Sequence, residues 1–291
     1  MKGKEFRELL KKPGLVCAPG AFDAWSARLV EMAGFSAVYM TGYGASASVL
    51  GKPDIGLMTM SEMATQAGNM ASAVAIPFIA DGDTGYGGVL NVMRTVEEFE
   101  KAGVAGLQLE DQVFPKRCGH MEGKQVIPKE EMAAKIRAAV HARKSDDFVI
   151  VARTDARAVT DLADAIARAH AYAEAGADVL FVEAPQTVAE MEEIVRELKL
   201  PLIANMVEKG KTPFLSAAEL ERIGYKIAIY PVSTLYAATR GMMKALKQLQ
   251  EKGSTQDCLE DLVSFEEFNN LVGVAEMRAL EKKFSQPARE P

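Results

Sequence analysis

The chain of 291 residues is 48% hydrophobic with a formal net charge of −6, a composition that indicates a globular protein with one large core. It has no block of Lys or Arg. This argues against a nucleic-acid surface, which needs a basic stripe to displace counterions from phosphates. Because it also has no signal-peptide h-region and no apolar run of about 18 residues, we expect neither secretion nor a membrane span. The prediction is a cytoplasmic protein with small-molecule partners.

Three cysteines stand far apart in the sequence, at positions 17, 118 and 258. An odd number at wide spacing fits a reducing compartment better than a disulfide framework or a zinc site. We therefore expect any functionally important cysteine to act as a free thiol.

Eight short apolar runs of strand type recur along the chain, each followed by an amphipathic helical stretch. The predicted strands cover residues 15–19, 37–41, 77–81, 106–110, 148–152, 178–183, 201–205 and 226–230. The helical stretch at 161–176 is expected to end at Gly176, since glycine is favoured just past a helix. This count predicts an α/β fold, the (β/α)8 TIM barrel. An open, doubly wound sheet is the alternative, because it needs no particular number of strands.

We expect one domain over residues 1–291, because no linker rich in Gly, Ser or Pro divides the chain. Residues 232–250 are expected to form the eighth helix, and residues 256–284 a helical C-terminal extension. The extension has an apolar face that a closed barrel has no interior left to cover. It is expected to pack on another subunit or across the outside of its own barrel.

In a barrel the active site forms where the strands end at their carboxyl edge. The residues at or just past the predicted strand ends are Thr41 with Gly42, Asp81 and Asp83, Glu110 with Asp111, Arg153 with Asp155, Glu183, and Asn205 with Glu208. Five of the eight predicted strands thus end in an ionisable side chain. A purely structural barrel would mostly carry turn residues such as Gly, Asn or Ser there. The pattern predicts an active site at this edge.

The stretch FIADGDTGYGG, residues 78–88, places two carboxylates, Asp81 and Asp83, between a strand and a cluster of glycines. Either residue alone is also typical of an Asx turn that caps the next helix. With Glu110 on the next strand and Asp54 in the preceding loop, the carboxylates would repel strongly unless a cation lay among them. Ligands that are all oxygen indicate Mg²⁺, with Mn²⁺ also possible. The spacing does not match a calcium EF-hand or a Walker-type phosphate loop.

Residues 111–128 form a connection much longer than the roughly two to six residues usual between strand and helix, so we expect a lid over the barrel mouth. Cys118 lies among Lys116, Arg117 and His120, three groups able to stabilise a thiolate. A surface cysteine in a mobile loop is the alternative interpretation.

Six motifs together resemble the isocitrate lyase / phosphoenolpyruvate mutase superfamily over nearly the whole chain. They are DGDTGYGG, LEDQ, KRCGH, ARTDA, EAPQ and NMVEKGKTP. KRCGH is similar to the signature of the carbon–carbon lyase branch, in which the cysteine donates a proton during cleavage, whereas the phosphonate mutases lack that cysteine. The resemblance implies a barrel whose eighth helix is swapped between partners and a homotetramer assembled from such dimers. This would account for the apolar extension.

The resemblance also implies roles for the motif residues. It makes Asp81 and Asp83 the core of a Mg²⁺ site, with Asp54 and Glu110 holding its waters. The implied substrate-binding positions are Thr41, Gly42, Tyr43, Gly119, His120, Arg153, Glu183, Asn205, Thr212 and Pro213. The implied catalytic residues are Cys118, which protonates carbon, Tyr39, which helps to move the proton at the hydroxyl, and Arg153, a charged fork for the substrate.

Departures from the family pattern inform the substrate. Methylisocitrate lyases hold a third carboxylate with two arginines, at positions where this chain has Tyr236 and Phe265. Without these guanidiniums a closed pocket lacks bidentate partners for an additional carboxylate. The resemblance therefore implies a small dicarboxylate, best fitted by 2,3-dimethylmalate, cleaved by retro-aldol chemistry to pyruvate and propionate. Arg240, one helical turn away, keeps methylisocitrate as an alternative.

Three other functions stay open on the sequence. An oxaloacetate hydrolase or decarboxylase would use the same site and differ in the position of a water molecule. A phosphonate enzyme is disfavoured by Cys118. A barrel used only for binding is disfavoured because the whole polar set is intact.

Overall fold

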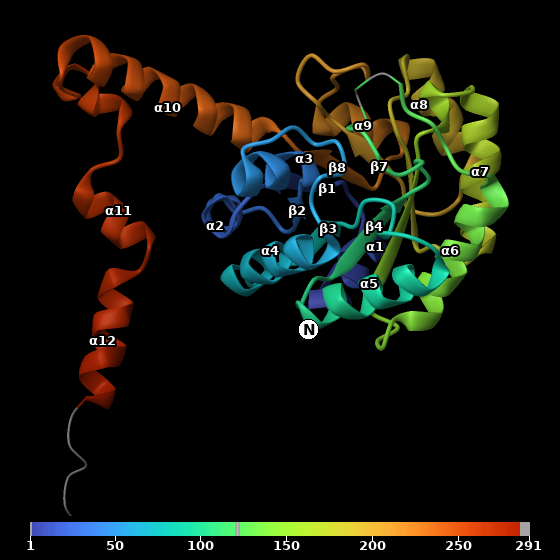
Figure 1. The fold of residues 1–291 in the computed structure, drawn as a ribbon, viewed down its shortest axis with the longest axis horizontal. Coiled ribbons are helices and arrows are strands. Elements are labelled where there is room, and N and C mark those ends of the chain that lie inside the picture. Colours follow the sequence, from blue (N-terminus) through green and yellow to red (C-terminus); the bar gives the residue numbers. More distant parts are fainter. Residues whose placement is uncertain (1, 120, 122, 286–291) are drawn as a thin grey trace, which may run out of the picture. The chain divides into compact units, whose positions relative to one another are not determined.

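The computed structural model describes residues 2–119, 121 and 123–285. The chain divides into two compact units, Met1–Leu235 and Tyr236–Pro291, each of which is described by itself (Figure 1). The expectation of a single domain with an extension at 256–284 stays a prediction.

The first unit is the predicted barrel of parallel strands. Its strands are β1 Val16–Ala21, β2 Val38–Met40, β3 Phe78–Asp81, β4 Gly106–Glu110, β5 Val149–Thr154, β6 Val179–Val182, β7 Ile203–Asn205 and β8 Ile227–Tyr230. Neighbours in sequence pair in parallel, and β1 also pairs with β8. A parallel bridge between Leu180 and Leu202 joins β6 to β7 and completes the ring. All eight predicted strands are confirmed, and closure rules out the open, doubly wound sheet.

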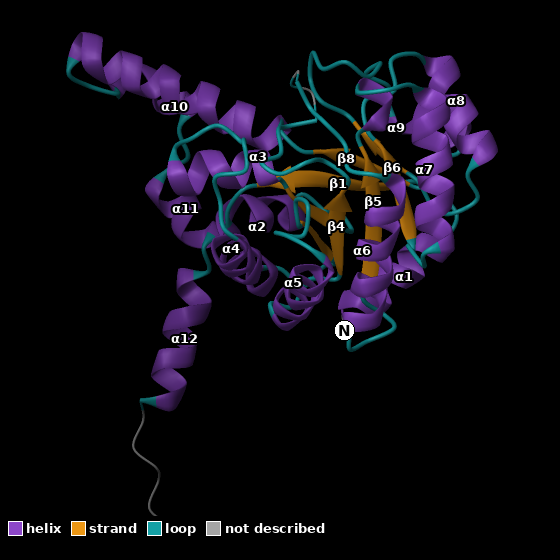
Figure 2. Ribbon diagram, turned by 45° about the vertical axis from the view of Figure 1, so that its right-hand side comes forward, coloured by secondary structure: helices purple, strands orange, loops and turns teal. Residues whose placement is uncertain are grey.

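Helices surround the strands as an outer layer, which Figure 2 shows in purple around orange strands. In the first unit they are α1 Lys2–Lys11, α2 Ala24–Met32, α3 Gly42–Ala45, the π-helix η1 Ser46–Leu50, α4 Met60–Ala73, α5 Val89–Lys101, α6 Lys129–Ala142, the 3₁₀-helix η2 Ala156–Ala158, α7 Leu162–Glu174, α8 Val188–Glu197, α9 Ala217–Ile223 and the start of α10 Ser233–Lys252. Local sequence sets their ends: Asp161 caps α7 by accepting from the Asp164 amide at 2.8 Å. Gly176, at φ +100°, follows that helix as predicted.

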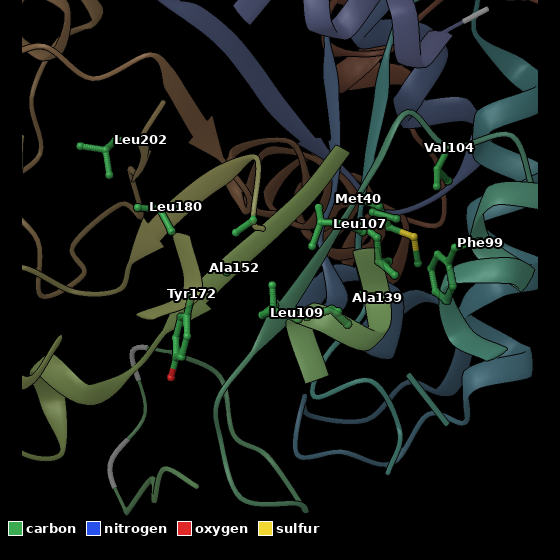
Figure 3. Close-up of a cluster of buried hydrophobic side chains, with 14 of the residues drawn as sticks. Met40, Phe99, Val104, Leu107, Leu109, Ala139, Ala152, Tyr172, Leu180 and Leu202 are labelled. Carbon is green, nitrogen blue, oxygen red and sulfur yellow. The ribbon is translucent and has the colours of Figure 1, made fainter. Parts of the chain in front are cut away.

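Each strand divides its side chains between two apolar cores, because successive residues point to opposite faces. The outward residues Leu107, Leu109 and Ala152 pack with the helix residues Phe99 and Tyr172 (Figure 3). The inward residues fill the barrel, which Phe6 of α1 also enters. This inner core comprises Phe6, Val16, Ala18, Ala37, Tyr39, Ile79, Ala105, Val149, Val151, Val179, Phe181, Ile203, Ile227 and Ile229. The barrel is therefore packed with side chains, and a site has to lie at its mouth.

The second unit consists of α10 from Tyr236 onward, the 3₁₀-helix η3 Gln256–Asp261, α11 Phe265–Leu271 and α12 Val274–Phe284. Within it, η3 is tied to α10 by ion pairs of Lys244 with Asp261 and of Lys252 with Asp257, both at 2.6 Å. Many of its apolar side chains are exposed: Met242, Met243, Leu246, Leu249, Leu259, Leu262, Val263, Phe265, Phe268, Met277, Leu280 and Phe284. Such a face is typical of a segment that packs on a partner.

Among residues 2–119, 121 and 123–285, no helix is both long enough and apolar enough to span a bilayer.

Candidate active site

The charged side chains at the barrel mouth continue the inward columns of the strands. Ile79, Val151 and Phe181 point into the barrel, so Asp81, Arg153 and Glu183, two residues further along, point the same way. The same rule places Asn205 above Ile203 on β7. The register of a closed sheet therefore brings together side chains that lie more than a hundred residues apart in sequence.

Two buried carboxylates, those of Asp54 and Asp83, contact the ammonium of Lys116 near the end of β3, and the buried Asp81 lies next to Asp83; we call these three aspartates the acid group. Lys116 Nζ lies 2.7 Å from Asp54 and 2.8 Å from Asp83 Oδ1, the second an ion pair without hydrogen-bond geometry. Asp81 accepts the Asp83 amide at 3.0 Å, so the Asx turn is also present. A Cβ at Gly42 would lie 2.6 Å from Asp81 Oδ2, which explains the glycine after β2.

The electrostatics of this acid group fit a cation. Burial raises the pKa of Asp83 to about 7, and Asp81 and Asp54 add to the rise against the pull of Lys116. Burial also raises the pKa of Glu110 well above its usual range, and one oxygen of that buried carboxylate accepts no hydrogen bond from any described residue.

Such a donor set suits Mg²⁺ rather than a metal held entirely by protein. No three His, Cys, Asp or Glu side chains converge as a ready-made metal site within the described part of the chain. Mg²⁺ keeps several waters and needs only one or two carboxylates. The residues present therefore fit a hydrated Mg²⁺.

Gln108 connects Tyr39 to the acid group. The Tyr39 hydroxyl donates to Gln108 Oε1 at 2.9 Å, and Gln108 Nε2 donates to Asp81 at 3.3 Å. Burial, and then the charge of Asp81, raises the pKa of Tyr39 well above 10, so the phenol stays protonated at neutral pH. Sequence reasoning missed Gln108, although a glutamine at an inward position of the buried strand GLQLE was a usable signal.

Arg153 faces acids on three sides. It makes two hydrogen bonds to Asp155, at 2.9 and 3.1 Å, and lies 3.3 Å from Glu183 and 3.5 Å from Glu110. Its guanidinium stacks over the Phe181 ring at 5.2 Å. Burial works against the charged form, but Asp155, Glu183 and Glu110 raise the pKa of Arg153, so it is a fixed cation.

The segment after β7 presents polar atoms with no partner in the described structure. Asn205 Nδ2 donates to Glu183 at 3.1 Å. Asn205 Oδ1, Thr212 Oγ1 and one oxygen of Glu208 are buried and make no hydrogen bond within the described residues. Unsatisfied buried polar groups are costly. Their presence on one segment indicates a place for a ligand.

The described residues of the predicted lid, 111–119, 121 and 123–128, fold back so that the two ends of the loop meet, and they contact the barrel mouth. The two ends meet where the Ile127 amide donates to the Asp111 carbonyl at 2.9 Å. Lys116 reaches the acid group, and Lys124 binds Asp155 at 2.7 Å and the Gly119 carbonyl. A cavity of about 540 Å³ is lined almost entirely by the loop itself.

The lid closes tightly at Gly119. A Cβ at this glycine would meet Arg153 Nη2 and lie 2.8 Å from Glu183 Cδ. Cys118, the neighbouring residue, is half-buried. The sequence predicts Lys116 as one of the groups able to stabilise a Cys118 thiolate. In the structure its ammonium instead forms ion pairs with Asp54 and Asp83. His120 lies outside the described residues.

The remaining predicted residues lie at the same carboxyl edge. Thr41 caps α3 by accepting from the Gly44 amide at 3.3 Å, so its hydroxyl has a structural role. Tyr43 and Pro213 are half-buried. Among the described residues, neither side chain makes a hydrogen bond or ion pair to the acid group or to the charged residues around Arg153. The predicted residues thus fall into an acid group at β3 and a group around Arg153, with Glu110 between them: its amide donates to the Asp83 carbonyl at 2.9 Å.

Comparison with known sequences gives one consistent set of relatives. The profile of the phosphoenolpyruvate phosphomutase family matches residues 6–250. The 2,3-dimethylmalate lyase of Eubacterium barkeri is 50% identical over 97% of each chain. A carboxyvinyl-carboxyphosphonate phosphorylmutase of Arabidopsis thaliana is 50% identical over 96% of this chain and 84% of its own. A 2-methylisocitrate lyase of Aeropyrum pernix is 44% identical over 99% and 92%.

Solved structures give the same picture. A 2,3-dimethylmalate lyase superposes with a TM-score of 0.93 at 36% identity, covering 99% of this chain and 97% of that one. Oxaloacetate acetylhydrolase bound to 3,3-difluorooxalacetate also reaches 0.93, at 34% identity over 99% of both chains. Phosphonopyruvate hydrolase in complex with oxalate and Mg²⁺ reaches 0.89, at 32% identity over 98% and 100%. The similarity covers nearly the whole of each chain.

Proposed function

Because the chain belongs to the phosphoenolpyruvate mutase / isocitrate lyase superfamily, we propose that it is a magnesium-dependent carbon–carbon lyase. Its proposed reaction is retro-aldol cleavage of 2,3-dimethylmalate to pyruvate and propionate. The observation that carries the proposal is that the loop around Cys118 contacts the barrel mouth on two sides: Lys116 lies on the acids, and Gly119 lies against Arg153. The 50% identity to a 2,3-dimethylmalate lyase supports the substrate.

The proposed metal ligands are Asp81 and Asp83, with Asp54 and Glu110 acting through waters. A related structure, that of phosphonopyruvate hydrolase, contains Mg²⁺. When bound, Mg²⁺ supplies a Lewis acid that lowers the cost of ionising the 2-hydroxyl group. Mn²⁺ accepts the same oxygen ligands.

The protein side chains act on both halves of the substrate. Thr41, Gly42 and Tyr43 are proposed to bind the pyruvate-like half at the end of β2. When the C2–C3 bond breaks, negative charge collects on the departing acid, and the fixed cation Arg153 stabilises it electrostatically. Asn205, Thr212 and Pro213 are proposed to contact that acid, with Asn205 Oδ1 and Thr212 Oγ1 as the polar atoms, since both are buried and make no hydrogen bond with a described residue.

Cys118 is the proposed general acid. Its thiol transfers a proton to the carbon that carried the broken bond, and the lid excludes water that would otherwise do so without stereocontrol. Gly119, and by resemblance His120, place the substrate beside it. Tyr39, protonated in its buried position, acts as a hydrogen-bond donor at the hydroxyl side of the site.

Selectivity for a dicarboxylate is proposed to follow from Tyr236 and Phe265, which stand where methylisocitrate lyases carry arginines. Both belong to the second unit. The exposed apolar face of that unit supports a homotetramer of helix-swapped dimers, with the barrel and its extension forming one functional domain. None of the three cysteines, all within the described residues, is in a disulfide, which fits the proposed reducing cytoplasm.

A second candidate is hydrolysis of oxaloacetate, favoured by the TM-score of 0.93 to oxaloacetate acetylhydrolase. A methylisocitrate lyase is favoured by the 44% identity to the Aeropyrum pernix enzyme. Both would use the same acids and Arg153, and they differ from the first candidate in what occupies the far end of the pocket.

One assay separates these candidates. Pyruvate release is measured with Mg²⁺ over 2,3-dimethylmalate, methylisocitrate and citramalate, and oxalate and acetate release over oxaloacetate. We expect the highest kcat/KM with 2,3-dimethylmalate. A higher kcat/KM with methylisocitrate or oxaloacetate would make that compound the proposed substrate instead. No product release from any of the four compounds would contradict the proposed lyase activity.

A further inference from the structure

The carboxylate of Asp155 is shared by two cations from different parts of the first unit. Arg153, on the same strand end, donates two hydrogen bonds to it, at 2.9 and 3.1 Å. Lys124, from the lid, lies 2.7 Å from Asp155 Oδ1. The side chains of Asp155 and Lys124 are 0% and 2% exposed. The proposed reaction uses Arg153 and assigns nothing to Asp155 or Lys124.

The backbone behind Asp155 is fixed by the helix layer. Asp111 accepts the Asp155 amide at 2.9 Å and the Thr154 hydroxyl at 2.7 Å. The same carboxylate accepts the Tyr172 hydroxyl at 2.7 Å and Arg168 at 3.2 Å, both from α7. Asp155 is therefore held in place from the helix layer, and Lys124 is the lid residue that contacts it.

The contact also determines what lies next to Arg153. Lys124 binds the Gly119 carbonyl as well as Asp155, and Gly119 packs against Arg153 and Glu183 without room for a methyl group. The contact of Lys124 with Asp155 therefore helps to hold Gly119, the neighbour of Cys118 in sequence, close to the Arg153 guanidinium. A buried ammonium without its carboxylate is strongly unfavourable, so the lid has a defined closed position.

We propose that Asp155 is a positioning residue that fastens the lid through Lys124 and aligns it with Arg153, so that closure places Cys118 for proton transfer. This inference rests on the proposed function for the roles of Arg153 and Cys118. The ionised state it needs is supported because Arg153 and Lys124 hold the pKa of Asp155 below its usual value, against the effect of burial.

The first test needs no substrate. In the full-length chain carrying Cys17→Ala and Cys258→Ala, the alkylation rate of Cys118 by iodoacetamide reports opening of the lid. Lys124→Met should raise that rate by about tenfold or more, since it removes one partner of a buried ion pair. Lys124→Arg should keep it slow, and Lys4→Met, on the exposed face of α1, should leave it unchanged.

Asp155→Asn should raise the alkylation rate by a similar factor, and the double variant with Lys124→Met should alkylate no faster than the more reactive single variant, because both changes break one contact. If Asp155→Asn does not fold, the comparison of Lys124→Met with Lys124→Arg decides the question alone. An alkylation rate in Lys124→Met equal to that of its parent overturns the proposal.

The second readout is pyruvate release from 2,3-dimethylmalate. Lys124→Met should lower kcat about tenfold or more with a smaller change in KM, because the lid acts after binding. Faster alkylation in a protein without lyase activity would keep the lid contact and reject the proposed function. An unchanged alkylation rate in a protein with normal lyase activity would reject the lid contact and keep the proposed function.

Discussion

The strand ends and the lid supply the same site by different physical means. Asp81, Arg153 and Glu183 sit on buried strands whose register is set by a packed barrel interior. The lid meets that surface through the lysines Lys116 and Lys124, together with the close approach of Gly119. In the proposed function, the strand ends provide a buried, charged surface and the loop carries Cys118, the proposed proton donor.

The most demanding test of this division concerns Cys118. Cys118→Ser should lower kcat for pyruvate release by about 10²- to 10⁴-fold, the usual contribution of a general acid. Mg²⁺ should still raise the melting temperature as in the parent, because the acid group is on the strands. Turnover at the parental rate would remove Cys118 from the reaction.

The substitution Arg153→Met tests the strand ends instead of the lid. The substitution leaves the buried carboxylates of Asp155, Glu110 and Glu183 without their guanidinium, so the free energy of unfolding should fall by roughly 3–5 kcal/mol. Lys124→Met should cost less, since Asp155 keeps Arg153 as its partner. Chemical denaturation of the two variants checks this order, and equal losses would show that lid and strand ends are equally structural.

Gly119→Ala tests the close approach between the two regions. An added methyl group would meet Arg153 and Glu183, whose side chains are held by other partners, so the lid has to stand off. We expect kcat to fall by about ten- to a hundredfold with little change in stability. The matched control is Gly88→Ala, where a Cβ would meet open space. Parental kcat in Gly119→Ala would argue against a closed working state.

The smallest expected effect lies at a rim ion pair outside both regions. Arg157 binds Glu190 at 2.6 and 2.8 Å and lowers the pKa of that carboxyl. A lowered pKa in the folded state means that the pair stabilises fully above the unfolded pKa, about 4.3, and that this stability is lost as pH falls through the lower folded pKa. Glu190→Gln should therefore lower the melting temperature by about 1 °C at pH 7 and by less at pH 3. An equal difference at both pH values would contradict this.

Much of the barrel and its charged mouth follows from the sequence. Strand positions can be read from short, continuous apolar runs such as FVIVA and DVLFV, and the charged residue that follows each run marks the end of its strand. The connections of the lid cannot be seen in this way. Lys116 is next but one to Cys118 in sequence yet binds Asp54 and Asp83, and Lys124 binds Asp155, because a long loop takes its contacts from tertiary closure and not from local pattern.

The central claim is that this chain breaks a carbon–carbon bond with the help of a divalent cation held by the acids after β3. The direct measurement is the initial rate of pyruvate release from 2,3-dimethylmalate in excess EDTA and after adding Mg²⁺ back. The account predicts loss of activity to background in EDTA and full recovery with Mg²⁺. An undiminished rate in EDTA would contradict it.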